Sequence, residues 1–214
     1  MEIADWTPYQ GEFLALAGLH FLAVLAPGAD FAITVRQSVR YGRWAGIATA
    51  LGIGSGISVH VIYTLLGIAA LLHTTPWMMT LARVLGAGYL LYLGIGLLRS
   101  RAPAPSSDGL PAAQAWQSRW QAFWVGFLTN ATNPKATLFF LAVFTTIVSP
   151  ATPLPVQMAY GVWMCTVNAS WFMLVALLFS QPQVQRTFLA VGYQFERAMG
   201  VFIVLLAVRL GWSF

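Results

Sequence analysis

Two ionisable residues of opposite charge interrupt long apolar stretches of the sequence. Asp30 lies within LAPGADFAITVRQ, and Lys135, the only lysine of the chain, lies within LTNATNPKATLFF. An ionisable side chain near the centre of a bilayer costs at least about 2.5 kcal/mol, so such residues are expected to have a function. Together, a carboxylate and an ammonium match the two charged groups of a zwitterion such as an amino acid.

A proline accompanies each of these residues. Pro27 and Pro134 each remove a backbone donor and clash with the preceding helical turn, and in lipid such breaks persist only where they are buried or line a wet cavity. The half-helices that follow present N–H groups to anions, and Gly28 lets a ligand approach the backbone. We expect Asn130 and Asn133 either to satisfy freed backbone groups or to bind substrate.

These residues predict a substrate site in which Asp30 faces an amine, while Lys135 and the N–H groups after Pro134 face a carboxylate. Asp30 is also the predicted proton carrier, since substrate arrival could shift the balance between its charged and neutral forms. The alternative is that Asp30 and Lys135 only neutralise each other as a buried pair, but such a pair does not need two broken helices. His60 is either a proton relay or a neutral histidine bonded to a neighbouring helix, and we expect His20 to have the second role.

The composition identifies an integral membrane protein. Hydrophobic residues make up 58% and charged residues 8% of the chain, whereas about a quarter of the residues of soluble proteins are charged. The mean hydropathy is +0.72. The net charge of +5 comes almost entirely from arginines at the ends of apolar segments, which favours a role in topology over nucleic-acid binding. A single cysteine allows no internal disulfide, and no cluster of metal ligands is apparent, so we expect neither a cofactor nor a metal.

Apolar windows of about twenty residues predict an all-α protein with six transmembrane helices, at 11–35, 45–72, 76–98, 122–148, 156–180 and 188–211. The loops on one side of the bilayer carry Arg36, Arg40, Arg43, Arg99, Arg101, Arg119 and Arg186. The loops on the other side, HTTPWMM and SPATPLPV, carry no lysine or arginine. The positive-inside rule therefore predicts cytoplasmic arginine loops and both termini outside.

The two halves of the chain resemble each other. The segment APGADFAITV corresponds to NPKATLFFLAVF, and ARVLGAGYLLYLG corresponds to ERAMGVFIVLLAV. Within a single transmembrane domain over 1–214, this predicts three-helix repeats at 1–98 and 122–214, joined by a cytoplasmic linker at 99–121. Because three is odd, the second repeat must be inverted, with the first and fourth helices broken at Pro27 and Pro134. Inverted repeats are a transporter architecture.

Four motifs resemble the LysE/RhtB family of amino-acid exporters, which includes homoserine and threonine efflux proteins. They are PGAD, RQSVRYGRWAGIATALGIGSGISVH, GAGYLLYLG and GFLTNATNPKATLFF, in order along nearly the whole chain. The resemblance implies export of amino acids across the bacterial inner membrane, usually coupled to protons. Ala29 departs from the family pattern, which more often has a second proline there. This departure predicts a milder distortion of the first helix.

The sequence therefore predicts a proton-coupled antiporter that exports small neutral amino acids. A dibasic substrate would need a second buried anion, and Asp30 is the only acid deep in the predicted spans. The alternatives are an exporter of another small solute or of a cation, or a non-transporting membrane assembly subunit. An enzyme is not expected, because no nucleophile has an obvious base. Two GxxxG spacings, within 42–46 and 52–56, permit either packing inside one subunit or a homodimer.

Overall fold

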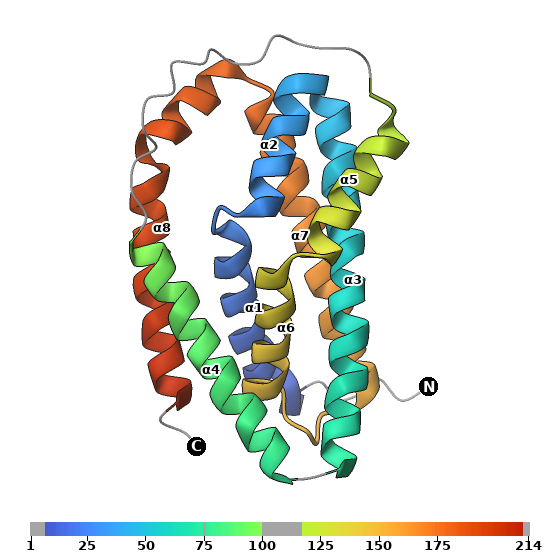
Figure 1. Cartoon of the computed structure of the whole chain (residues 1–214), viewed down its shortest axis with the longest axis vertical. Coiled ribbons are helices and arrows are strands. Elements are labelled where there is room, and N and C mark those ends of the chain that lie inside the picture. Colours follow the sequence, from blue (N-terminus) through green and yellow to red (C-terminus); the bar gives the residue numbers. More distant parts are fainter. Residues whose placement is uncertain (1–6, 75, 100–116, 212–214) are drawn as a thin grey trace.

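The computed structural model describes residues 7–74, 76–99 and 117–211, and every regular element in these ranges is a helix (Figure 1). The elements are η1 (Thr7–Tyr9), α1 (Gln10–Leu25), α2 (Ala29–Tyr41), α3 (Arg43–Thr74), α4 (Pro76–Leu98), α5 (Arg119–Ala131), α6 (Pro134–Thr146), α7 (Leu154–Phe179) and α8 (Pro182–Gly211). The prediction of an all-α protein is therefore confirmed for these residues.

Both predicted prolines interrupt helices. α1 ends before Pro27, and α2 leaves the break at an angle of 50°. This bend is present although Ala29 replaces the second proline, so a single proline followed by glycine is enough to break the helix. The second break separates α5 from α6 at residues 132–133, and Pro134 is the first residue of α6, where its missing N–H costs no helical hydrogen bond.

Several predicted boundaries are wrong by a turn or more. The first span was expected to end at 35, but α2 continues to Tyr41, because its polar last turns stay helical beyond the apolar stretch. The helix expected at 188–211 begins at Pro182, since proline is favoured in a first helical turn. The predicted linker 99–121 overlaps the start of α5. Ser118 and Gln121 form a capping box there. Residues 100–116 of that linker lie outside the described residues.

The described helices have the surface of a membrane protein. α3 and α7 are each long and apolar enough to cross a membrane, and α1 with α2 qualify together as one bent span. Large apolar side chains such as Leu14 and Leu66 are 69% and 68% exposed. Exposed apolar surface on this scale is unfavourable in water and is expected against lipid.

Glycines bring α3 and α5 into close contact. A side chain on Gly52 would overlap the backbone of Phe123, and one on Gly126 would overlap the backbone of Thr49. The GxxxG spacing at 52–56 therefore packs against another helix of the same chain. At the end of this helix pair, Arg43 and Arg119 both lie over the ring of Trp44, each 5.3 Å from its centroid.

α1, α2 and α6 lie between α4 and α8 on one side and α3 on the other, and α5 runs along α3 (Figure 1). α3 packs against α5 and α7, and α2 packs against α3 and α7. α4 packs against α8 and also against α6, whereas among the described residues α8 makes no comparable contact with α2. The two breaks consequently face each other near the middle of the molecule, with α3 and α7 behind them.

Candidate functional site

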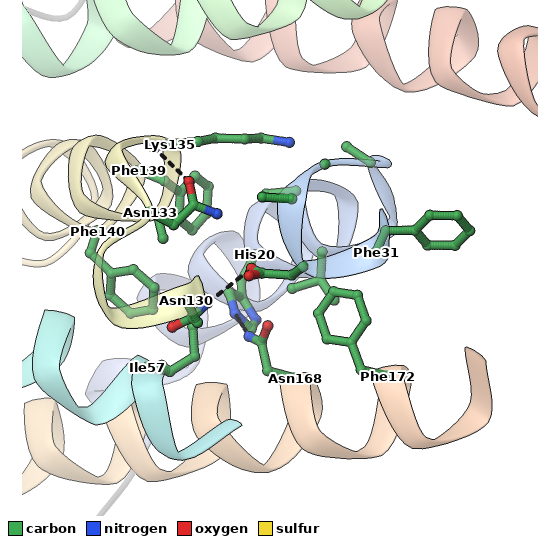
Figure 2. Close-up of a pocket in the computed structure, with 17 residues that line it drawn as sticks. His20, Phe31, Ile57, Asn130, Asn133, Lys135, Phe139, Phe140, Asn168 and Phe172 are labelled. Carbon is green, nitrogen blue, oxygen red and sulfur yellow. Dashed lines mark hydrogen bonds between the residues drawn. The ribbon is translucent and has the colours of Figure 1, made fainter. Parts of the chain in front are cut away.

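A pocket lies where the two helix breaks meet (Figure 2). It contains about 500 Å³ of space outside the protein atoms, part of it open to the exterior. The predicted site residues that line it are Gly28, Asp30, Asn130, Asn133 and Lys135. The structure thus brings residues about a hundred positions apart in the sequence into one cavity.

The start of α2 forms one side of the pocket. Gly28 is in an extended conformation and no side chain caps the helix, so the N–H groups of Ala29 and Asp30 have no partner within the helix. The positive end of the helix dipole adds to these donors. This end of α2 is therefore suited to an anionic group.

The start of α6 differs, because Asn133 caps it. The Asn133 Oδ1 atom accepts a hydrogen bond of 3.0 Å from the Lys135 N–H, and Pro134 has no N–H. Of the N–H groups that we expected to face a carboxylate after Pro134, helical geometry leaves that of Ala136, which also lines the pocket. From α4, the Tyr89 hydroxyl donates a 2.8 Å hydrogen bond to the Lys135 carbonyl.

The Lys135 side chain extends from α6 toward the first break. Its Nζ atom is 3.4 Å from the position that a Cβ on Gly28 would occupy, so glycine leaves the space that the ammonium approaches. Lys135 also interacts electrostatically with Asp30. The ammonium and the uncapped start of α2 consequently lie on the same side of the pocket.

Asp30 and Asn130 connect the two breaks. The Asn130 Nδ2 atom donates a hydrogen bond of 2.9 Å to Asp30 Oδ2. The other side-chain oxygen of each residue, Oδ1 in both, is buried and has no hydrogen-bond partner among the described residues. Gly56 makes room for Asn130, since a Cβ there would lie 2.9 Å from its Oδ1 atom. Two acceptors with unmet capacity are thus available to a ligand that carries N–H groups.

His60 lies behind Asn130 and is not among the lining residues. Its Nε2 atom is 2.8 Å from the Asn130 carbonyl oxygen, and its Nδ1 atom is 2.8 Å from the Tyr63 hydroxyl. Because a carbonyl only accepts, Nε2 carries the hydrogen and Nδ1 accepts from Tyr63. The ring also stacks on Phe140. His60 therefore satisfies a carbonyl at the end of α5. Asn130 links it to Asp30 by hydrogen bonds, and His60 and Asp30 also interact electrostatically.

The pocket includes residues that the sequence did not indicate. They are His20 and Asn168 on the polar side, and Phe139, Phe140 and Phe172 on the apolar side. One signal was available for His20, because positions 20, 23, 24 and 27 share a face at helical spacing, and this face leads directly to the first break. Asn168 lies on α7 and comes near the pocket only through tertiary packing.

Comparison with known proteins places the chain among bacterial membrane proteins. The threonine efflux protein of Escherichia coli (strain K12) is 32% identical over 183 residues, which are 85% of this chain and 86% of that protein. The uncharacterized membrane protein YahN of the same strain is 27% identical over 211 residues, or 98% and 93% of the two chains. The leucine efflux protein of Salmonella choleraesuis (strain SC-B67) is 32% identical over 138 residues, or 64% and 63%. No solved structure matches the chain significantly.

The family model for the LysE type translocator matches residues 21–213, which include both breaks and every residue of the pocket except His20. Proteins of this family are transporters rather than enzymes. The resemblance seen in the four sequence motifs is thereby confirmed, and the chain belongs to the family of LysE type translocators.

Proposed function

We propose that this protein exports small neutral amino acids across the bacterial inner membrane by exchange with protons. The observation that carries the proposal is the pocket between the breaks, where a carboxylate, an ammonium and an uncapped helix start face one cavity. The relatives named as threonine and leucine efflux proteins support this class of substrate.

In the proposed binding mode, the substrate ammonium lies against Asp30 Oδ1 and Asn130 Oδ1, two buried oxygens that accept no hydrogen bond from the described residues. Asn133 also interacts with the Asp30 carboxylate. The substrate carboxylate lies between the Lys135 ammonium and the first N–H groups of α2. This differs from the sequence-based expectation, because Asn133 already occupies the Lys135 N–H at the start of α6.

For proton coupling, we propose Asp30 as the carrier, since it is the acid in contact with the bound amine. When the substrate leaves, the carboxylate loses a compensating positive charge and takes up a proton more readily. His60 is the second residue of the proton path, because it binds the same Asn130 that holds Asp30.

For the architecture, we propose six spans in two inverted halves, within 1–98 and 122–214. Two spans are broken helices, α1 joined to α2 and α5 joined to α6, and the other four are α3, α4, α7 and α8. Asp30 is the second residue of α2 and Lys135 is the second residue of α6, which supports equivalent roles for the two breaks. Both termini lie outside in this arrangement. We do not propose a homodimer through the 52–56 glycines, because helix α5 of the same chain occupies that face.

The test is amino-acid counterflow in proteoliposomes, with and without an imposed pH gradient. We expect exchange of small neutral amino acids by the wild type and net flux driven by the gradient. Asp30→Asn and Lys135→Ala should each lower exchange by at least about tenfold, because each leaves a partly buried charge without its partner. Arg36→Gln on the exposed surface of α2 is the matched control for loss of one charge.

Two results would contradict parts of the proposal. If the folded, inserted wild type exchanges none of these amino acids, the amino-acid assignment is wrong, and cations and other small solutes should be tested next. If Asp30→Asn transports and still responds fully to the pH gradient, Asp30 is not the proton carrier.

A further inference from the structure

His20 is bonded to a neighbouring helix, as the sequence predicts, and it also lines the pocket. Its side chain is 1% exposed and lines the cavity from α1. The Asn168 Nδ2 atom lies 2.8 Å from His20 Nε2 and 3.2 Å from the Met164 carbonyl oxygen. A carbonyl oxygen only accepts hydrogen bonds, so the Asn168 amide must turn its NH₂ group, and not its oxygen, toward Met164. This NH₂ group has two hydrogens and donates to both the carbonyl and His20. His20 Nε2 is therefore an acceptor.

This contact determines which nitrogen of His20 carries the hydrogen. A neutral imidazole that accepts at Nε2 donates at Nδ1, and a doubly protonated ring would place an N–H against the N–H of Asn168. The Nδ1 atom is buried and has no hydrogen-bond partner among the described residues. Nearly all buried donors are paired in folded proteins. The pocket therefore contains one buried donor for which the described residues provide no acceptor.

The side chains around the ring of His20 are mostly aromatic. The ring centroids of Phe139 and Phe140 are 6.1 Å and 6.3 Å from that of His20, and the centroid of Trp163 is 5.6 Å away. None of these three side chains offers a strong acceptor. A ligand atom at Nδ1 would lie next to the second turn of α6, whereas Lys135 is in its first turn.

The location separates this donor from Lys135, the group proposed for the substrate carboxylate. Figure 2 shows Lys135 on one side of the pocket and His20 with Asn168 on the other. A substrate whose ammonium and carboxylate occupy Asp30 and Lys135 would direct its side chain toward His20. A neutral imidazole among aromatic rings suits a neutral oxygen better than a carboxylate, which needs a compensating charge.

We infer that His20, held by Asn168, binds the hydroxyl of the substrate side chain through its Nδ1–H group, while Phe139, Phe140 and Phe172 contact the apolar part. The site thereby selects hydroxyl-bearing amino acids over apolar ones of equal shape. This inference rests on the proposed function and adds a specificity-determining residue to it.

The experiment compares threonine with valine, which differ by a hydroxyl in place of a methyl group, as competitors in counterflow. One neutral hydrogen bond corresponds to a preference of up to about tenfold for threonine in the wild type. The side-chain amide of His20→Gln reaches the position of Nε2 and leaves no donor at the position of Nδ1. This variant should therefore weaken threonine more than valine and bring the ratio to about one. His20→Asn, whose amide nitrogen occupies the Nδ1 position, should restore the preference for threonine. Size-exclusion profiles and melting temperatures of both variants provide the folding control.

The outcomes separate this inference from the proposed function. If the wild type exchanges no amino acid, the proposed function fails, and this inference with it. If the wild type exchanges amino acids but does not distinguish threonine from valine, the inference alone is wrong. Equal loss of both substrates in His20→Gln would also overturn it, since a residue that binds the carboxylate or only supports the fold affects both alike. The wild-type ratio needs no substitution, so a variant that misfolds leaves the inference testable.

Discussion

Lys135 occupies a position that helix electrostatics alone would disfavour. It is the second residue of α6, where the positive end of the helix dipole repels a cation, whereas Asp30 at the same place in α2 is favoured. The Lys135 side chain leaves its own helix start and approaches Gly28 in the other break. A lysine that gains nothing from its own helix is thus best explained by what it contacts across the pocket.

Asn133 is expected to stabilise the second break independently of transport. Its Oδ1 atom caps α6, so Asn133→Ala should lower the free energy of unfolding by about 1 kcal/mol. Asn133→Ser keeps a neutral capping oxygen and should lose less. Chemical unfolding of the detergent-solubilised variants would measure both, and equal stability of the Ala and Ser variants would show that the cap is not stabilising.

At the scale of the elements, α3 acts as the support for the second break. Its glycines allow α5 to approach at backbone distance, and the last turn of α5 contains Asn130, the residue that binds Asp30. The position of the polar pocket atoms therefore depends on how closely two apolar helices pack.

Gly52→Ala tests this dependence. The added methyl group would meet the Phe123 backbone, which cannot rotate away, so we expect destabilisation of about 1–3 kcal/mol from overpacking, together with weaker substrate binding. Gly88→Ala on α4 is the matched control, since nothing lies within 4 Å of the added atom and alanine favours the helix. Melting temperatures and counterflow on both variants give the comparison. Equal behaviour would mean that α5 can shift without moving Asn130.

The sequence predicts the helical class and the positions of the two breaks, but not every helix boundary and not the contacts between helices. The breaks at Pro27 and Pro134 could be predicted because proline acts on its own turn of helix. The place of Asp30 and Lys135 in the pocket could be predicted because ionisable groups are costly in lipid. The bond between His20 and Asn168 could not, since it joins residues 148 positions apart through the packing of α1 on α7. Nor does the sequence show that Asn133 caps α6 while α2 is left uncapped.

For the whole molecule, the two proposed halves are not in the same conformation. α4 contacts α6, but its counterpart α8 has no comparable contact with α2 among the described residues. In the proposed inverted repeat, this difference in packing is expected if each half can adopt both arrangements. Alternating access by inverted repeats requires this property.

Distances between spin labels would test whether the two proposed halves exchange conformations. The labels would be introduced in a Cys165→Ser background, which removes the only native cysteine. One label pair, at Arg36 and Arg197, reports on α2 and α8, and a second pair, at Tyr92 and Leu138, reports on α4 and α6; all four positions are exposed. Substrate or a pH gradient should bring the first pair together while separating the second. Distances that stay constant, or that change in the same direction, would contradict the exchange.

The contact between α4 and α6 also predicts the helix contacts of the opposite-facing conformation. If the halves exchange roles, interchanging their labels in the present set of helix contacts gives the contacts of the opposite-facing protein, with α8 against α2 and α6 released from α4. The residues buried between α4 and α6 would then become the walls of a passage on one side of the membrane. Their equivalents on α8 and α2 would close the passage on the other.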